Sequence, residues 1–271
     1  MPHSNDITLR TLDGLQLAGT LVTPDSPAHR AVALVHGGGV TRDEGGFFTR
    51  LAAGLAEAGI ASLRYDQRGH GTSDGTQETR TLAEHLNDIE MALGAVRSST
   101  GALEVSLLGT SFGGGLAAYY AAKRPHGLHR LVLLNPQLSY MNRYIEQKPH
   151  WQGGVLDDEA AATLARQGYL DHSDTVKHSR AFLNEVFWLR PDEVIGEITP
   201  PTLLVHGTED TFVPVETSRR AADELQCEHA LVEIEGAQHG FAVHDDPTYA
   251  DPQSQEWQAF VITTVREWLT V

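Results

Sequence analysis

The sequence has one cysteine, few basic residues for its acidic content and no long apolar run. Cys227 is the single cysteine among 271 residues, which excludes an intrachain disulfide and a thiolate metal cluster. The 20 lysines and arginines stand against 36 aspartates and glutamates, so the formal net charge is -16. Because such a chain repels phosphate and anionic lipid, we expect neither a nucleic-acid nor a membrane partner.

Further absences narrow the class of protein. The start MPHSNDITLR has no basic or apolar leader region, and no apolar run approaches the ~20 residues of a membrane span, which predicts a cytoplasmic protein. Histidines and carboxylates are not clustered at metal-ligand spacing, so we predict no metal. GTSFGGG and GHGTSDG differ from the G-x-G-x-x-G of dinucleotide-binding loops, so we expect no cofactor. These patterns make no prediction of the oligomeric state.

Short apolar runs and amphipathic runs alternate along most of the chain. Residues 7–24 alternate apolar and polar side chains around Asp13-Gly14, which predicts an antiparallel hairpin. From Ala31 on, the alternation is typical of an α/β fold, with a mostly parallel sheet covered by helices on both faces. The predicted strands are AVALVH, ASLRYD, VSLLGT, LVLLNP, TLLVHG and ALVEIEG, and helices are predicted over 47–59, 82–97, 112–124, 215–226 and 254–269.

The alternation stops between residues 137 and 195. This stretch reads as helical pieces with no strand among them. We interpret residues 137–195 as a helical cap insertion, and residues 1–136 together with 196–271 as one α/β core. The length of the chain fits one large domain with an insertion better than two full domains.

One serine stands between two glycines where an apolar run ends and a helical run begins, in VSLLGTSFGGGLAAYYAAK. The G-x-S-x-G pattern alone is weak, because about one such chain in ten contains it by chance. Its context is specific: a strand ends at Gly109, a sharp turn follows, and a helix starts at once, which exposes the hydroxyl of Ser111 above the sheet edge. Ser111 is therefore a candidate nucleophile, and a plain turn serine is the alternative.

A nucleophilic serine needs a histidine base that is held by a carboxylate. Asp210 follows the predicted strand TLLVHG, and His239 follows ALVEIEG. Because parallel strands bring their carboxyl ends to one edge of a sheet, both loops are expected to reach Ser111. We predict Ser111, Asp210 and His239 as the catalytic residues, with Glu209 as the alternative acid.

The glycine-rich loop HGGG at residues 36–39 follows an early strand. Glycines let the main chain approach a substrate, so we predict an oxyanion hole formed by the backbone N–H groups of Gly38 and Phe112, with the glycine one position before or after Gly38 as the alternative donor. His36 and His206 are expected to shape loops through hydrogen bonds.

Another loop, RYDQRGHGTSDG, is expected to be held beneath the site by a partly buried ion pair between Asp66 and Arg68.

Together these residues resemble the α/β-hydrolase superfamily, from the amino-terminal hairpin to the last helix. RYDQRGHGTSDG is similar to the R-x-D-x-R-G-x-G-x-S loop of many members, and HGTEDTFVP and GAQHGF are similar to their acid and histidine loops. Within the superfamily the chain most resembles the small capped bacterial serine esterases, including the cinnamoyl and feruloyl esterase-like group. One departure is Thr110, where members commonly have histidine.

The resemblance implies a serine hydrolase that cleaves a carboxylic ester with a lipophilic or aromatic group through an acyl-enzyme intermediate, with a small-molecule ester or acyl substrate as its partner. The alternatives are an acyltransferase, cyclase or thioesterase with the same three residues, or a ligand-binding module. Four aromatic residues of the cap are candidates for substrate contact, and one or two of them are expected to touch the substrate: Tyr140, Tyr144, Trp151 and Trp188.

Overall fold

The computed structural model describes residues 2–244, 246 and 248–271, and within them one eight-stranded sheet runs in the order β1-β2-β4-β3-β5-β6-β11-β12. The hairpin of β1 and β2 is antiparallel, β2 pairs antiparallel with β4, and all later neighbours are parallel. The mostly parallel sheet with an amino-terminal hairpin is thereby confirmed. The strands are β1 (His3–Arg10), β2 (Gln16–Thr23), β3 (Arg30–Val35), β4 (Ile60–Tyr65), β5 (Glu104–Thr110), β6 (Leu131–Leu134), β11 (Thr202–Gly207) and β12 (His229–Ile234).

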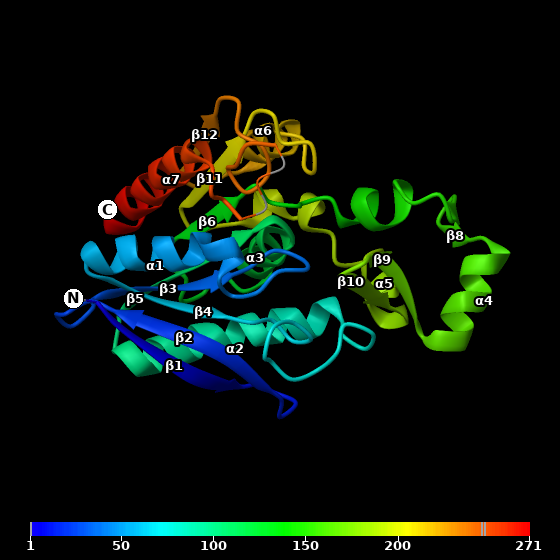
Figure 1. Ribbon diagram of the computed structural model, residues 1–271, viewed down its shortest axis with the longest axis horizontal. Helices are drawn as coiled ribbons and strands as arrows, with labels where there is room; N and C mark the ends of the chain where they lie inside the picture. The colour runs from blue at the N-terminus through cyan, green and yellow to red at the C-terminus, as the bar shows by residue number, and fades with distance from the viewer. Residues whose placement is uncertain (1, 245, 247) are drawn as a thin grey trace.

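Helices cover both faces of this sheet, as expected (Figure 1). On one face, α1 (Phe47–Glu57) and α7 (Pro252–Thr270) pack against each other and share an apolar cluster with the strands. On the other face, α2 (Leu82–Thr100), α3 (Ser111–Lys123) and α6 (Glu216–Glu224) enclose a larger cluster. The strands between the two layers are almost entirely apolar because both of their faces are buried. None of the helices in the described ranges combines the length and apolar character of a membrane span.

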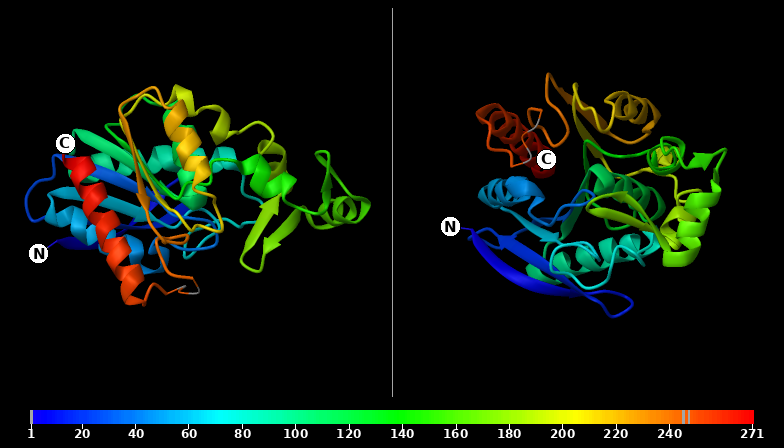
Figure 2. Two further views of the ribbon diagram at one scale, coloured as in Figure 1. Left: turned by 90° about the horizontal axis from the view of Figure 1, so that it is seen from above. Right: turned by 45° about the vertical axis from the view of Figure 1, so that its right-hand side comes forward.

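Residues 137–195 leave the sheet after β6 and extend beyond one end of it, away from both termini (Figures 1 and 2). They contain short helical elements and two small hairpins, β7 with β8 and β9 with β10. The expectation of no strand in this stretch is therefore wrong. These strands are short and mix polar with apolar residues, so no apolar run marks them. The elements are η2 (Asn142–Glu146), β7 (Trp151–Gln152), β8 (Val155–Leu156), α4 (Asp158–Gln167), β9 (Tyr169–Ser173), β10 (Val176–Ser179), α5 (Arg180–Glu185) and η3 (Pro191–Glu193), followed by η4 (Ile195–Glu197).

Asp66 and Arg68 do not pair with each other, so the predicted ion pair between them is wrong. Asp66 accepts two hydrogen bonds from Arg42, one from the guanidinium at 2.6 Å and one from the backbone N–H of Arg42 at 2.7 Å. Arg68 is 3% exposed and donates to the fully buried carboxylate of Asp88 at 2.6 Å. Each side chain meets a partner on a different neighbouring segment, Arg42 before α1 and Asp88 on α2. Both charges are therefore compensated, but by residues that are distant in sequence.

Candidate active site

Ser111 lies at the junction of β5 and α3 and has a φ of +50°, in the left-handed region that favours glycine. The turn is tight because the helix starts directly on the strand. A Cβ added to Gly109 would overlap the carbonyl oxygen of Gly113, and a Cβ added to Gly113 would overlap that of His36. The two glycines of the motif thus meet a steric requirement of the turn that holds Ser111 in its strained conformation.

The loops after β11 and β12 bring Asp210 and His239 to Ser111. His239 Nε2 lies 3.0 Å from Ser111 Oγ, and His239 Nδ1 lies 2.6 Å from Asp210 Oδ2. An Nδ1–H that donates to the carboxylate leaves Nε2 as the acceptor for the serine hydroxyl. Glu209, the alternative acid, is exposed, and the structure does not bring it to His239.

The carboxylate of Asp210 is fixed by several donors. Its Oδ1 accepts backbone N–H groups from Phe212 and Val213, both at 2.9 Å. Burial alone would raise the pKa of Asp210, but hydrogen bonds from His206 and His239 outweigh it and hold the pKa well below its ordinary value. Asp210 is therefore an ionised acceptor that orients His239. His206 also lies 2.8 Å from the carbonyl oxygen of Val213 and so shapes this loop.

The glycine-rich loop after β3 is anchored from both sides. His36 Nε2 accepts the N–H of Gln67 at 3.0 Å, so its Nδ1–H donates to the carbonyl of Gly37 at 2.7 Å. Burial lowers the pKa of His36 to about 4, which keeps this neutral tautomer in place. The N–H of Gly37 donates to Glu44 Oε2 at 2.8 Å. Because that N–H is engaged by Glu44, the next one along the loop, that of Gly38, is the candidate oxyanion donor.

Glu44 is a site residue that the sequence analysis missed. It belongs to η1 (Glu44–Gly46), and its backbone has a φ of +48°. Burial raises the pKa of its carboxyl group to about 7, although the bond from Gly37 opposes this rise. An acidic residue within VTRDEGG, a few residues after the glycine-rich loop, was the only signal available in the sequence.

Ser111 and His239 open into a cavity of about 300 Å³ between the sheet and residues 137–195. Gly38 and Phe112, the two residues of the predicted oxyanion hole, line the same cavity. A Cβ on Gly38 would lie 3.7 Å from Phe112 Cβ, which places the two residues side by side. The two residues of the predicted oxyanion hole therefore lie on the wall of the cavity that Ser111 lines.

Among the four aromatic candidates for substrate contact, the structure brings Tyr144 to the cavity wall. Tyr140 is buried beneath it, where its hydroxyl donates to the carbonyl of Phe112 at 2.7 Å. Trp151 packs on Phe187, with ring centroids 5.9 Å apart. Trp188 is 83% exposed. The last three side chains do not line this cavity: Tyr140 is held against Phe112 of the core, Trp151 packs within the 137–195 stretch, and Trp188 points to solvent.

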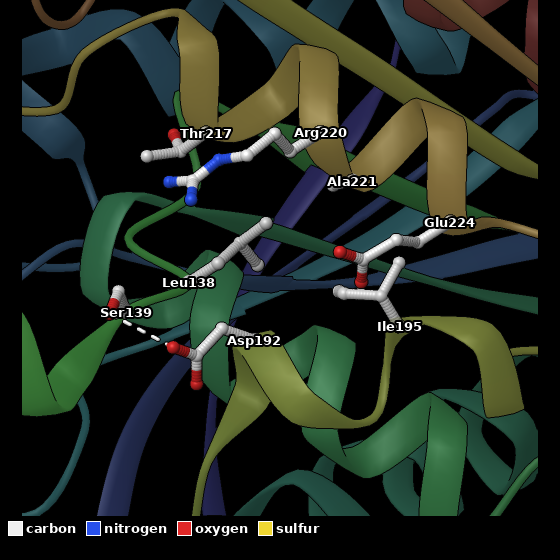
Figure 3. A pocket seen from close by; sticks show the side chains of 8 residues that line it. All are labelled: Leu138, Ser139, Asp192, Ile195, Thr217, Arg220, Ala221 and Glu224. Atoms are coloured by element: carbon white, nitrogen blue, oxygen red, sulfur yellow. Dashed lines mark hydrogen bonds between the residues drawn. The ribbon is translucent and has the colours of Figure 1, made fainter.

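A second cavity, of about 180 Å³, lies where residues 137–195 rejoin the core beside α6 (Figure 3). Leu138 and Arg220 line it, and Ser139 donates to Asp192 at 2.9 Å. It contains none of the three predicted catalytic residues. Within the described residues, no group of three or more His, Cys, Asp or Glu side chains is placed to hold a metal ion.

The sheet, the strained serine turn and the arrangement of Ser111, His239 and Asp210 define an α/β hydrolase. More closely, the chain belongs to the family described as serine aminopeptidase, S33, which matches residues 26–161.

Among curated proteins, a monoacylglycerol lipase of Mycolicibacterium smegmatis is 24% identical over 240 residues, which cover 82% of this chain and 84% of that one. Protein ABHD8 of Bos taurus is 28% identical over 219 residues, and the chain spans 48% of its length. Among solved structures, Est1E from Butyrivibrio proteoclasticus with bound ferulic acid has a TM-score of 0.75 at 23% identity, covering 96% of this chain and 99% of that one. The structural likeness shows the fold.

Proposed function

We propose that this protein is a serine hydrolase that cleaves a carboxylic ester with a lipophilic or aromatic group through an acyl-enzyme intermediate. The observation that carries the proposal is the continuous hydrogen-bonded chain from Ser111 Oγ through His239 to Asp210, at 3.0 Å and 2.6 Å. A serine becomes nucleophilic when a histidine can take its proton and a buried carboxylate stabilises the resulting cation. Ser111 and His239 line a cavity, and Asp210 lies behind His239.

In the proposed mechanism, Ser111 Oγ attacks the ester carbonyl while His239 Nε2 takes its proton. The carbonyl oxygen becomes an oxyanion, which the backbone N–H groups of Gly38 and Phe112 stabilise. His239 then gives its proton to the alcohol oxygen as the carbon–oxygen bond breaks, and the acyl group remains on Ser111. A water molecule that loses its proton to His239 releases the carboxylic acid, and Ser111 regains its proton.

The cavity and the relatives support the proposed substrate class. Phe112, Tyr144 and Phe212 supply aromatic walls on which an apolar or aromatic group can pack. One relative is a monoacylglycerol lipase, and one structural neighbour has ferulic acid bound. We further propose that residues 137–195 act as a cap, because Tyr144, His172 and other members of this stretch form a wall of the cavity over Ser111.

The test is labelling with a fluorophosphonate followed by intact-mass and peptide analysis. We expect a single adduct on Ser111 in the wild type and none in Ser111→Ala. Ser173→Ala is the matched control, because Ser173 lines the same cavity without contacting His239 in the hydrogen-bonded chain above. Ser111→Ala should also lower kcat on 4-nitrophenyl esters by about 10³-fold or more. A folded wild type without an adduct, or a Ser111→Ala rate within tenfold of wild type, would overturn the proposal.

A further inference from the structure

The cavity over Ser111 is lined by basic side chains, although the chain as a whole is acidic. The protein carries a formal net charge of -16, yet the cavity is lined by Arg143, His172 and His239 and, among its described lining residues, by no aspartate or glutamate. The one permanent charge in this lining, the guanidinium of Arg143, is positive, and beside a reactive serine it attracts anionic substrates and disfavours cationic ones.

Arg143 lies close to the proposed reaction centre. It belongs to η2, and its guanidinium carbon is 5.9 Å from the centre of the Phe212 ring. The Phe212 ring is in turn 5.4 Å from the ring of His239. One aromatic side chain therefore separates the guanidinium from the imidazole, and a ligand of a few carbon atoms can reach from Ser111 to Arg143.

Nearby acids are engaged away from Arg143. Glu146 and Glu216 line the adjoining cavity that Arg143 shares. Glu146 accepts a hydrogen bond from the side chain of Asn142, and Glu216 accepts one from Arg219 at 3.3 Å. In the described part of the chain, other arginines form salt bridges with aspartate or glutamate, but Arg143 forms none. Its guanidinium is therefore available to pair with a carboxylate of a ligand.

The neighbours of Arg143 experience its charge. Burial, together with the positive charges of Lys148, Arg143 and Arg80, lowers the pKa of His172 to about 4. Burial and Arg143 also lower the pKa of Lys148. His172 is consequently a neutral N–H donor at physiological pH, and its ring lies 5.3 Å from that of Tyr144 on the same cavity wall. These neutral donors can add hydrogen bonds to an anion without supplying a competing negative charge.

We propose that the ester cleaved at Ser111 carries a carboxylate, which pairs with the guanidinium of Arg143 while the ester carbonyl lies between Ser111 and the oxyanion donors. The planar guanidinium can bind both carboxylate oxygens, and His172 and Tyr144 border the same space. This inference rests on the proposed ester hydrolysis and specifies its substrate class as half-esters of dicarboxylic acids or esters with an equivalent free carboxylate.

The experiment compares 4-nitrophenyl monoesters of succinic, glutaric and adipic acid with their neutral methyl 4-nitrophenyl diesters, by release of nitrophenolate. For at least one chain length, we expect the wild-type kcat/KM to be about tenfold or more higher for the charged ester. Arg143→Met should abolish this preference, and Arg143→Lys should restore part of it. The matched control is Arg166→Met, because Arg166 is an exposed arginine of α4 outside the cavity, and it should keep the wild-type preference.

A second readout does not require turnover. Glutarate should slow the labelling of Ser111 by a fluorophosphonate in the wild type, dimethyl glutarate should slow it less, and Arg143→Met should remove the difference. Equal wild-type rates for charged and neutral esters, or a preference that Arg143→Met leaves intact, would overturn the carboxylate inference while ester hydrolysis stands. Absence of both labelling and ester cleavage in a folded protein would instead overturn the proposed function, and this inference with it.

Discussion

Glu44→Gln should make the protein more stable at alkaline pH and leave its stability unchanged in acid. In the folded protein, burial raises the pKa of Glu44 from 4.5 to about 7. The protonated carboxyl group is therefore favoured by folding, and its contribution to stability is complete below pH 4.5. As the pH rises past about 7, the folded protein must carry a partly buried carboxylate, and that contribution is lost.

The magnitude follows from the difference between the two pKa values. One pKa unit corresponds to 1.36 kcal/mol, so full ionisation of Glu44 reduces the free energy of unfolding by about 3 kcal/mol. Glutamine has the shape of the protonated glutamate and keeps an oxygen that can accept the N–H of Gly37, but it does not ionise. Relative to wild type, Glu44→Gln should therefore be close to neutral at pH 4.5 and about 3 kcal/mol more stable at pH 8.5.

The assay is urea denaturation followed by tryptophan fluorescence, at intervals from pH 4.5 to pH 8.5. Comparing each variant with wild type at the same pH cancels the other titrating groups. Glu57→Gln is the matched control, because Glu57 is exposed at the end of α1, and its difference should stay near zero throughout. A Glu44→Gln difference that is constant with pH, or a variant less stable than wild type at pH 8.5, would refute the reasoning.

Three further predictions concern the site and its support. Asp210→Asn should lower kcat by about 10³–10⁴-fold on a 4-nitrophenyl ester, because His239 would lose its orienting carboxylate; a loss below tenfold would contradict this role. Gly113→Ala should lower the free energy of unfolding by about 3 kcal/mol, because the added methyl group meets the carbonyl oxygen of His36. The control Gly94→Ala in α2 adds its methyl group into open space and should stabilise the protein by up to ~1 kcal/mol, so equal effects of the two variants in thermal denaturation would exclude this explanation. Asp88→Ala should lower the free energy of unfolding measured in urea by about 1–3 kcal/mol, because the buried Arg68 loses its shortest hydrogen bonds but keeps Asp13 and Glu84 as partners. An unchanged free energy of unfolding would show that the pair with Asp88 is dispensable.

The sequence predicted the structure best where neighbouring residues must meet a steric requirement of the fold. The strands of the core are short apolar runs, and the turn at Ser111 needs glycine at 109 and 113, so both could be recognised from neighbouring letters. Asp210 and His239 could be placed at the same edge because they follow two predicted parallel strands. Each of these inferences depends on residues close together in the chain.

The parts that could not be predicted depend on which distant segments meet. Arg68 pairs with Asp88 instead of Asp66 because α2 lies against its loop, and no local pattern records that contact. Glu44 and Arg143 look like ordinary surface charges in the sequence, and only the folded chain places them beside the serine turn and the cavity. Strands β9 and β10 lack the apolar runs on which the prediction relied.

The position of residues 137–195 between β6 and β11 makes this stretch replaceable at a small cost in stability. These strands are parallel neighbours, so the chain must cross from the end of one to the start of the other in any case. A crossover between parallel strands needs about a dozen or more residues, and here it spans residues 135–201, which is roughly two doublings of that length. Each doubling raises the entropic cost of closing the loop by about 0.6 kcal/mol, so the longer crossover costs about 1.2 kcal/mol. Exchanging this stretch for one of another sequence should therefore leave the sheet that positions Ser111, Asp210 and His239 intact.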